Sequence, residues 1–180
     1  MKIAIISSSL RKKSHSLVLS TYASAYLENT HQFNTDLINM QDYPLPLCCP
    51  DDAYSDANVI KLKSMIESAD SVIFSTPIYN YEVNSVLKNL LDLTGEAWHD
   101  KLVGMMCSAG GSRSYMAVMS FANSLMLNFR CLIVPRFVYA TKNDFNSAGK
   151  EISNDKIKMR IEEICDRMVK LTRALAVDNT

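Results

Sequence analysis

Short apolar runs alternate with longer amphipathic stretches along the chain, and this alternation limits the fold more than any other feature. The apolar runs cover residues 2–6, 33–38, 71–75, 102–107 and a last run of 131–134 with 137–139, interrupted by Pro135. Runs such as 2–6 and 71–75 have the length and composition of a strand that is buried on both faces, whereas 33–38 is a weaker run that predicts an edge or second strand. The runs therefore predict the strands of a largely parallel sheet.

The stretches between these runs have apolar residues at helical spacing. They cover residues 16–27, 58–68, 83–98, 114–129 and 155–177. Strands that alternate with helices form a parallel sheet with helices on both faces. For 180 residues and five strands, we predict one flavodoxin-like α/β domain over residues 1–180, a three-layer sandwich with strand order 2-1-3-4-5. Three prolines within residues 41–52 predict a loop there.

Composition and charge exclude several classes of protein. The chain has 19 basic and 19 acidic residues and a formal net charge of zero, which argues against a nucleic-acid binder. Its five cysteines include no CxxC pair, and its three histidines lie at no metal-ligand spacing, so no metal site is expected. We expect Cys48 and Cys49 to be reduced thiols in a loop; the alternative is a redox-active pair.

No targeting or membrane segment is expected. The N-terminus lacks the pattern of a signal peptide. No apolar stretch reaches the length of about 18 residues that a transmembrane helix needs. The sequence therefore predicts a cytoplasmic protein without a membrane span.

Polar residues follow the first predicted strand, in the segment SSSLRKKSHS (residues 7–16). In a sheet of this order, ligands bind at the carboxyl ends of the strands, where the strand order reverses. Serine hydroxyls, backbone N–H groups and the next helix N-terminus can bind an oxyanion, and the guanidinium of Arg11 suits a phosphate. The segment predicts a phosphate site; the alternative is a solvated loop with a serine cap.

Two further loops predict a site for a flat ring. The segment STPIYNYEVNS (residues 75–85) carries a rigid Pro77, two tyrosines and an asparagine, which together can hold a planar heterocycle. In CSAGGSRS (residues 107–114), a glycine pair lets the backbone approach a ligand closely. The alternatives are tyrosines that cap the core and a glycine pair that forms a flexible turn.

The sequence does not contain the motifs of several other nucleotide-binding sites. The chain has no GxGxxG segment for a dinucleotide and no GxxxxGK[ST] segment for a nucleoside triphosphate. A receiver domain would need acidic residues after the first strand, where this chain has serines. A ligand with one phosphate and a planar head remains, and FMN meets that description.

The three loops, in this order, resemble the motifs of the NADPH-dependent FMN reductase family, which includes azoreductases, chromate reductases and quinone reductases of flavodoxin-like fold. The family's GSLRxxSxN-type loop corresponds to residues 8–16, its TPEYN-type turn to 76–80, and its glycine-bearing loop to 108–111. The resemblance covers nearly the whole chain. Ser8, Ser16 and Ile78 stand where the family usually has glycine, asparagine and glutamate.

The resemblance implies a bound FMN and a role for twelve residues. The phosphate would be bound by Ser9, Arg11, Ser14 and Ser16. The isoalloxazine ring and the ribityl chain would be lined by Pro77, Ile78, Tyr79, Asn80 and Tyr81. The pyrimidine edge of the ring would be approached by Ser108, Gly110 and Gly111. No side chain is expected to act as a catalytic acid or base.

The resemblance also implies an activity. NADPH or NADH would give a hydride to the flavin, which would then reduce a small-molecule acceptor such as free flavin, a quinone or an azo compound, with ping-pong kinetics. A homodimer or homotetramer is expected, with the helix after the third strand at the interface. The alternatives are an FMN-binding electron-transfer protein without nicotinamide oxidase activity, and a regulatory domain that has lost its flavin.

Overall fold

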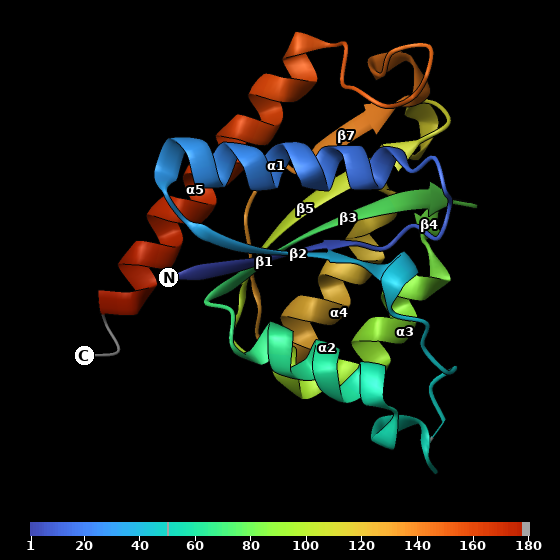
Figure 1. Cartoon of the computed structure of the whole chain (residues 1–180), viewed down its shortest axis with the longest axis vertical. Helices are drawn as coiled ribbons and strands as arrows, with labels where there is room; N and C mark the ends of the chain where they lie inside the picture. The colour runs from blue at the N-terminus through green and yellow to red at the C-terminus, as the bar shows by residue number, and fades with distance from the viewer. Residues whose placement is uncertain (50, 178–180) are drawn as a thin grey trace.

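The computed structural model describes residues 1–49 and 51–177, and a sheet between two layers of helices forms its centre (Figure 1). The strands are β1 (Lys2–Ser7), β2 (Asn34–Asn39), β3 (Ser71–Tyr79), β4 (Glu82–Val83), β5 (Leu102–Ala109), β6 (Leu132–Ile133) and β7 (Val138–Thr141). Their order is β2-β1-β3-β5-β6, with β4 paired to β3 and β7 paired to β5. Because β6 and β7 both run parallel to β5 as two parts of a broken fifth strand, the predicted order 2-1-3-4-5 is confirmed.

The helices cover both faces of the sheet, as predicted. They are α1 (His15–His31), α2 (Ala57–Glu67), α3 (Ser85–Thr94), α4 (Met119–Phe129) and α5 (Asp155–Val177). Helices α1 and α5 lie on one face, and α2, α3 and α4 lie on the other (Figure 1). Side chains of β1 alternate between the two cores: Ile3 and Ile5 pack on the side of α1 and α5, and Ile6 packs on the opposite side.

A short hairpin replaces the predicted start of the third helix. Strand β3 continues past Ser75 to Tyr79, and β4 follows it, so that α3 begins at Ser85 rather than at residue 83. Strand β3 tolerates Pro77 because β1 pairs with β3 only as far as Ser75, which leaves one side of the proline free of a ladder. The helix ends at Thr94, and Gly95–Trp98 form a 3₁₀ turn.

Two other segments differ in detail from the prediction. The first part of the predicted helix 114–129 is a 3₁₀ segment, Ser112–Val118, and the α-helix begins at Met119. The predicted loop 41–52 contains the end of a 3₁₀ turn, Met40–Asp42, and its Pro50 lies outside the described residues. Across residues 1–49 and 51–177, no helix combines the length and the apolar character that crossing a bilayer requires.

Candidate cofactor site

The carboxyl ends of β1, β3 and β5 meet at one edge of the sheet and border a cavity of about 210 Å³. Eight residues predicted from the sequence line it: Ser9, Arg11, Ser14, Pro77, Ile78, Tyr79, Ser108 and Gly110. The structure adds Lys13, His15, Ala109 and Lys142 to its wall. The predicted residues Ser16, Asn80, Tyr81 and Gly111 do not line it. The three predicted loops therefore do converge on one site.

The wall of this cavity is strongly basic. The side chains of Arg11, Lys13 and Lys142 make no ion pair or hydrogen bond to another described residue, and none of the described lining residues is acidic. Burial, and after it the charge of Arg11, lowers the pKa of His15. Because these cations have no partner in the part of the chain that the structure describes, they can bind an anion in the cavity through charge-assisted hydrogen bonds.

Two serines of the loop after β1 have hydrogen-bond partners within the protein. Ser14 caps α1, since its Oγ accepts a hydrogen bond from the backbone N–H of Leu17 at 3.0 Å. Ser16 is 1% exposed, and its Oγ shares a hydrogen bond of 3.0 Å with Oγ of Ser108. Ser14 still lines the cavity, whereas the hydroxyl of Ser16 joins α1 to the end of β5.

Ser75 continues this buried contact to β3. Its Oγ donates to the carbonyl of Ser16 at 2.7 Å and lies 2.6 Å from Oγ of Ser20. All three residues are fully or almost fully buried. We refer to Ser16, Ser20, Ser75 and Ser108 as the hydroxyl network. This network fixes the N-terminal turn of α1 against the two central strands.

Asn84 connects the loop after β1 to the turn after β3. Its Nδ2 donates to the carbonyl of Ser8 at 2.8 Å, and its Oδ1 accepts from Oγ of Ser8 at 2.8 Å. The same Oδ1 accepts from the backbone N–H of Leu87 at 3.2 Å and so caps α3. Sequence reasoning missed this residue, although an asparagine directly before a helical stripe is a cap signal.

The contacts of Ser8 explain why a serine can replace the glycine that is usual there. Ser8 is not among the described residues with positive φ, so its backbone does not need glycine. Its side chain is fully buried and is bonded to Asn84 and to the carbonyl of Ser75. The serine therefore strengthens the connection between the two loops and introduces no backbone strain.

The turn between β3 and β4 carries backbone strain. Asn80 has φ of 50° and Tyr81 has φ of 62°, so both central residues of this two-residue hairpin are left-handed, as in a type I′ turn. Such a conformation costs about 1–3 kcal/mol for a residue other than glycine. Tyr79 and Tyr81 are 54% and 65% exposed, so neither tyrosine caps the core. Strain and exposed aromatic rings together indicate a binding surface.

The glycine pair after β5 leaves open space beside the cavity. A Cβ atom added at Gly110 or at Gly111 would meet no heavy atom within 4 Å. The loop is nevertheless held in place, because the hydroxyl of Tyr139 donates to the carbonyl of Gly111 at 2.6 Å. A flat ring can therefore approach the backbone here.

The chemistry of the residues that line this cavity fits a flavin mononucleotide. Cations without a partner among the described residues and an N-capped helix start suit a phosphate. A proline, an exposed tyrosine and the open glycine loop suit a planar ring.

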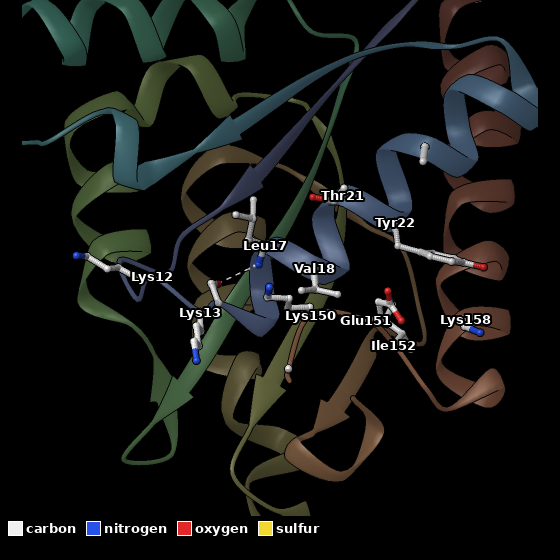
Figure 2. A pocket seen from close by; sticks show the side chains of 13 residues that line it. Lys12, Lys13, Leu17, Val18, Thr21, Tyr22, Lys150, Glu151, Ile152 and Lys158 are labelled. Atoms are coloured by element: carbon white, nitrogen blue, oxygen red, sulfur yellow. Dashed lines mark hydrogen bonds between the residues drawn. The ribbon is translucent and has the colours of Figure 1, made fainter. Parts of the chain in front are cut away.

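A larger groove of about 630 Å³ lies outside this site, along α1 (Figure 2). Leu17, Val18 and Ile152 give it an apolar floor, and it shares only Lys13 and Ser14 with the cavity. Figure 2 shows Lys150 beside Val18 and Lys158 at the end near Tyr22. Burial, followed by the hydrogen bond to Glu162, raises the pKa of Tyr22 to about 12.

Comparison with known proteins gives consistent matches. Over 172 residues the chain is 26% identical to an FMN reductase (NADPH) of Pseudomonas aeruginosa, with 94% of this chain and 91% of that protein covered. Over 165 residues it is 24% identical to an NADPH azoreductase of a Bacillus species, with 88% and 89% covered.

A solved structure supports the fold. The flavoenzyme NAD(P)H:(acceptor) oxidoreductase FerB of Paracoccus denitrificans superposes with a TM-score of 0.77 at 22% identity, covering 96% of this chain and 97% of that one.

The model of the NADPH-dependent FMN reductase family matches residues 1–146, which include all three loops of the site. The chain therefore belongs to the NADPH-dependent FMN reductase family of oxidoreductases.

Proposed function

We propose that this oxidoreductase binds FMN in the 210 Å³ cavity, with the phosphate at the end of Arg11 and the ring at the end of Tyr79. The observation that carries the proposal is that one cavity wall combines cations unpaired among the described residues with a proline, an exposed tyrosine and an open glycine loop. A ligand that joins a phosphate to a planar ring matches both sets of groups at once.

The residues of the chain would bind and orient the cofactor. Arg11 and the backbone N–H groups of residues 9–14 would hold the phosphate, while Asn84 and the hydroxyl network keep that loop in place. Backbone N–H groups at Gly110 and Gly111 would stabilise negative charge at the polar edge of the ring. The flavin, when bound, supplies reversible acceptance of a hydride.

No side chain of the cavity needs to act as an acid, a base or a nucleophile. Burial raises the pKa of the Cys107 thiol to about 12, so this cysteine beneath the site stays protonated and unreactive. We propose that NADPH or NADH and then the acceptor use the same exposed side of the ring in turn, which gives ping-pong kinetics. The azoreductase relative supports an azo compound as one acceptor, beside quinones and free flavin.

We also propose that the chain forms a homodimer or a homotetramer. Several large apolar side chains of the segment 112–118 and of α4 are exposed, with Met116 at 62% and Leu127 at 77% exposure. A second copy would cover such a surface. Analytical ultracentrifugation tests this proposal, and a single monomeric species at micromolar concentration would contradict it.

The activity is tested with FMN-loaded protein. Under anaerobic conditions, NADPH or NADH should bleach the flavin absorption, and added benzoquinone should restore it. Initial rates at several quinone concentrations should give parallel double-reciprocal plots. Bound FMN that neither nucleotide bleaches would contradict the reductase and favour an electron-transfer flavoprotein. A protein that binds no FMN would favour a regulatory domain.

A further inference from the structure

The groove of about 630 Å³ along α1 takes no part in the proposed flavin site (Figure 2). It is bordered by residues of α1 and by the segment 149–152, with Lys158 of α5 at the end near Tyr22. It shares only Lys13 and Ser14 with the flavin cavity. Its volume is within the range of about 300–1,000 Å³ that is usual for small-molecule sites. The groove is therefore large enough for a ligand of its own.

Helix α1, which lines this groove, carries its polar and apolar residues in an inverted arrangement. Its buried residues, half of them serines, are Ser16, Leu19, Ser20, Ala23, Ser24 and Leu27. The residues that line the groove include Leu17, Val18, Tyr22 and Ala25, which are partly or fully exposed. No residue from 16 to 27 is charged. Because a surface helix normally presents polar and charged residues to solvent, the outer side of α1 is unusually apolar.

Contacts within the protein explain the buried serines but not the apolar outer side. Ser16 and Ser20 belong to the hydroxyl network, and Oγ of Ser24 shares a hydrogen bond of 2.6 Å with Oγ1 of Thr35. The hydroxyl of Tyr22 donates to the carboxylate of Glu162 at 2.6 Å. Every polar group on this helix named here therefore has a partner, whereas the apolar side chains in the groove remain open to a ligand.

Lysines surround these apolar side chains. Four of them line the groove: Lys12, Lys13, Lys150 and Lys158. Apart from Lys158, which is paired with Asp155 at 2.9 Å, their side chains make no ion pair or hydrogen bond to another described residue. Glu151 is the only acidic residue among the described residues that line the groove. The groove therefore attracts a negatively charged group.

We propose that this groove binds an amphipathic carboxylate of the class of a medium-chain fatty acid, at a site separate from the flavin site. The apolar chain would lie on Leu17, Val18 and Ile152, and the carboxylate would be held by Lys150, which Figure 2 shows beside Val18. A small inorganic anion would leave the apolar side chains uncovered, and a neutral hydrocarbon would leave the lysines unpaired. A concave space of this volume suits a small molecule, whereas a protein partner needs a broader surface.

The test begins with the chain and the head group of the ligand. Titration calorimetry of the full-length protein as purified measures dissociation constants for octanoate, decanoate and dodecanoate below their micelle concentrations. Each added methylene that is buried should lower the dissociation constant about threefold to fourfold. Dodecyltrimethylammonium has the same chain as dodecanoate and the opposite charge, and it should bind at least about tenfold more weakly.

Two pairs of variants locate the binding. Lys150→Gln removes a lysine from the groove, and Lys156→Gln makes the same change in charge at an exposed residue of α5 outside it. Ala25 is exposed, so Ala25→Glu places a carboxylate in the groove, and Ala25→Gln controls for size at a similar helix propensity. We expect Lys150→Gln to weaken dodecanoate binding about threefold to tenfold and Ala25→Glu to weaken it about tenfold, with both controls within about threefold of the parent. Neither Ala25 nor Lys150 lines the flavin cavity, so the affinity for FMN should not change.

Each outcome supports or overturns the proposal. Saturable binding of about one dodecanoate per chain, weakened by Lys150→Gln and Ala25→Glu and retained in the controls, supports it. Absence of binding, equal binding of dodecanoate and dodecyltrimethylammonium, or equal losses in Lys150→Gln and Lys156→Gln would overturn it and leave the flavin site untouched. If Ala25→Glu instead dissociates an oligomer in analytical ultracentrifugation, a second copy of the chain covers the groove and the proposal is overturned.

Discussion

Two sets of polar side chains lie at the same edge of the sheet and differ in how their hydrogen-bonding groups are satisfied. Ser8, Ser75 and Asn84 are buried, and each of their side chains is bonded to another part of the protein. Arg11 and Lys142 line the cavity and make no side-chain contact of this kind within the described residues. The difference shows that the first set stabilises the frame of the site, whereas the second is available for a ligand.

This comparison separates two kinds of measurement. Substitutions in the buried set should lower the free energy of unfolding of the protein without flavin. Substitutions in the cationic set should lower the affinity for flavin and leave the free energy of unfolding nearly unchanged.

The largest effect is expected for Asn84→Ala. The change removes the cap of α3 and the partner of the Ser8 carbonyl, and it takes one of two partners from the Ser8 hydroxyl, which keeps the carbonyl of Ser75. The free energy of unfolding should fall by about 2–4 kcal/mol in urea titrations. Asn123→Ala, at an exposed position of α4, should change it by less than about 0.5 kcal/mol. Equal effects of the two substitutions would contradict the role given to Asn84.

Arg11→Ala should lower the affinity for FMN by about tenfold to a hundredfold, because a charged hydrogen bond to the phosphate is lost. The free energy of unfolding should stay within about 0.5 kcal/mol of the parent value. Lys12→Ala is the matched control, since Lys12 lies in the same loop but lines only the groove along α1. If Lys12→Ala weakens FMN binding as much as Arg11→Ala does, the binding is not local to the cavity.

Ser75→Ala should have a moderate effect on stability. It removes the bond to the carbonyl of Ser16 and the partner of Oγ of Ser20. The expected loss is about 1–2 kcal/mol in the free energy of unfolding. Ser112→Ala, at an exposed position, is the control. A variant of normal stability with weak FMN binding would place Ser75 in the ligand-binding set instead.

The smallest effect is expected from His15 and depends on pH. Burial, and then Arg11, lowers the pKa of His15 from its ordinary value of 6.5. Near pH 6.5 and below, the unfolded chain therefore binds more protons than the folded chain. The contribution of His15 to the free energy of unfolding is fully present above this pH and is lost as the pH falls. His15→Gln should reduce the slope of stability between about pH 5 and pH 7 in the flavin-free protein. Identical slopes for both proteins would contradict this.

The order of elements could be predicted from the sequence because each strand is a continuous apolar run and each helix an amphipathic stripe. The hairpin after β3 could not. Type I′ turns are usually marked by Asn-Gly or Asp-Gly, and here Asn80 is followed by Tyr81. The tyrosine accepts positive φ despite its side chain, which no local pattern reveals.

Only those parts of the site that belong to contiguous sequence motifs could be predicted. Arg11 and the glycine loop belong to contiguous motifs. Lys142 and His15 come from segments far apart in sequence, and only the folded segment 142–149 brings them to the same wall. The orientation of each serine side chain also could not be predicted from the sequence. Ser16 belongs to a serine-rich segment, yet its hydroxyl forms a hydrogen bond with Ser108 inside the protein.

The most direct test of the account compares FMN with riboflavin, which differ only by the phosphate. Titration calorimetry at low salt should give a dissociation constant for FMN about a hundredfold lower than for riboflavin, because the charged hydrogen bonds to the phosphate are lost. Added salt should reduce the difference. Equal dissociation constants for the two flavins would show that the cationic end of the cavity does not bind the phosphate, and would contradict the proposed site.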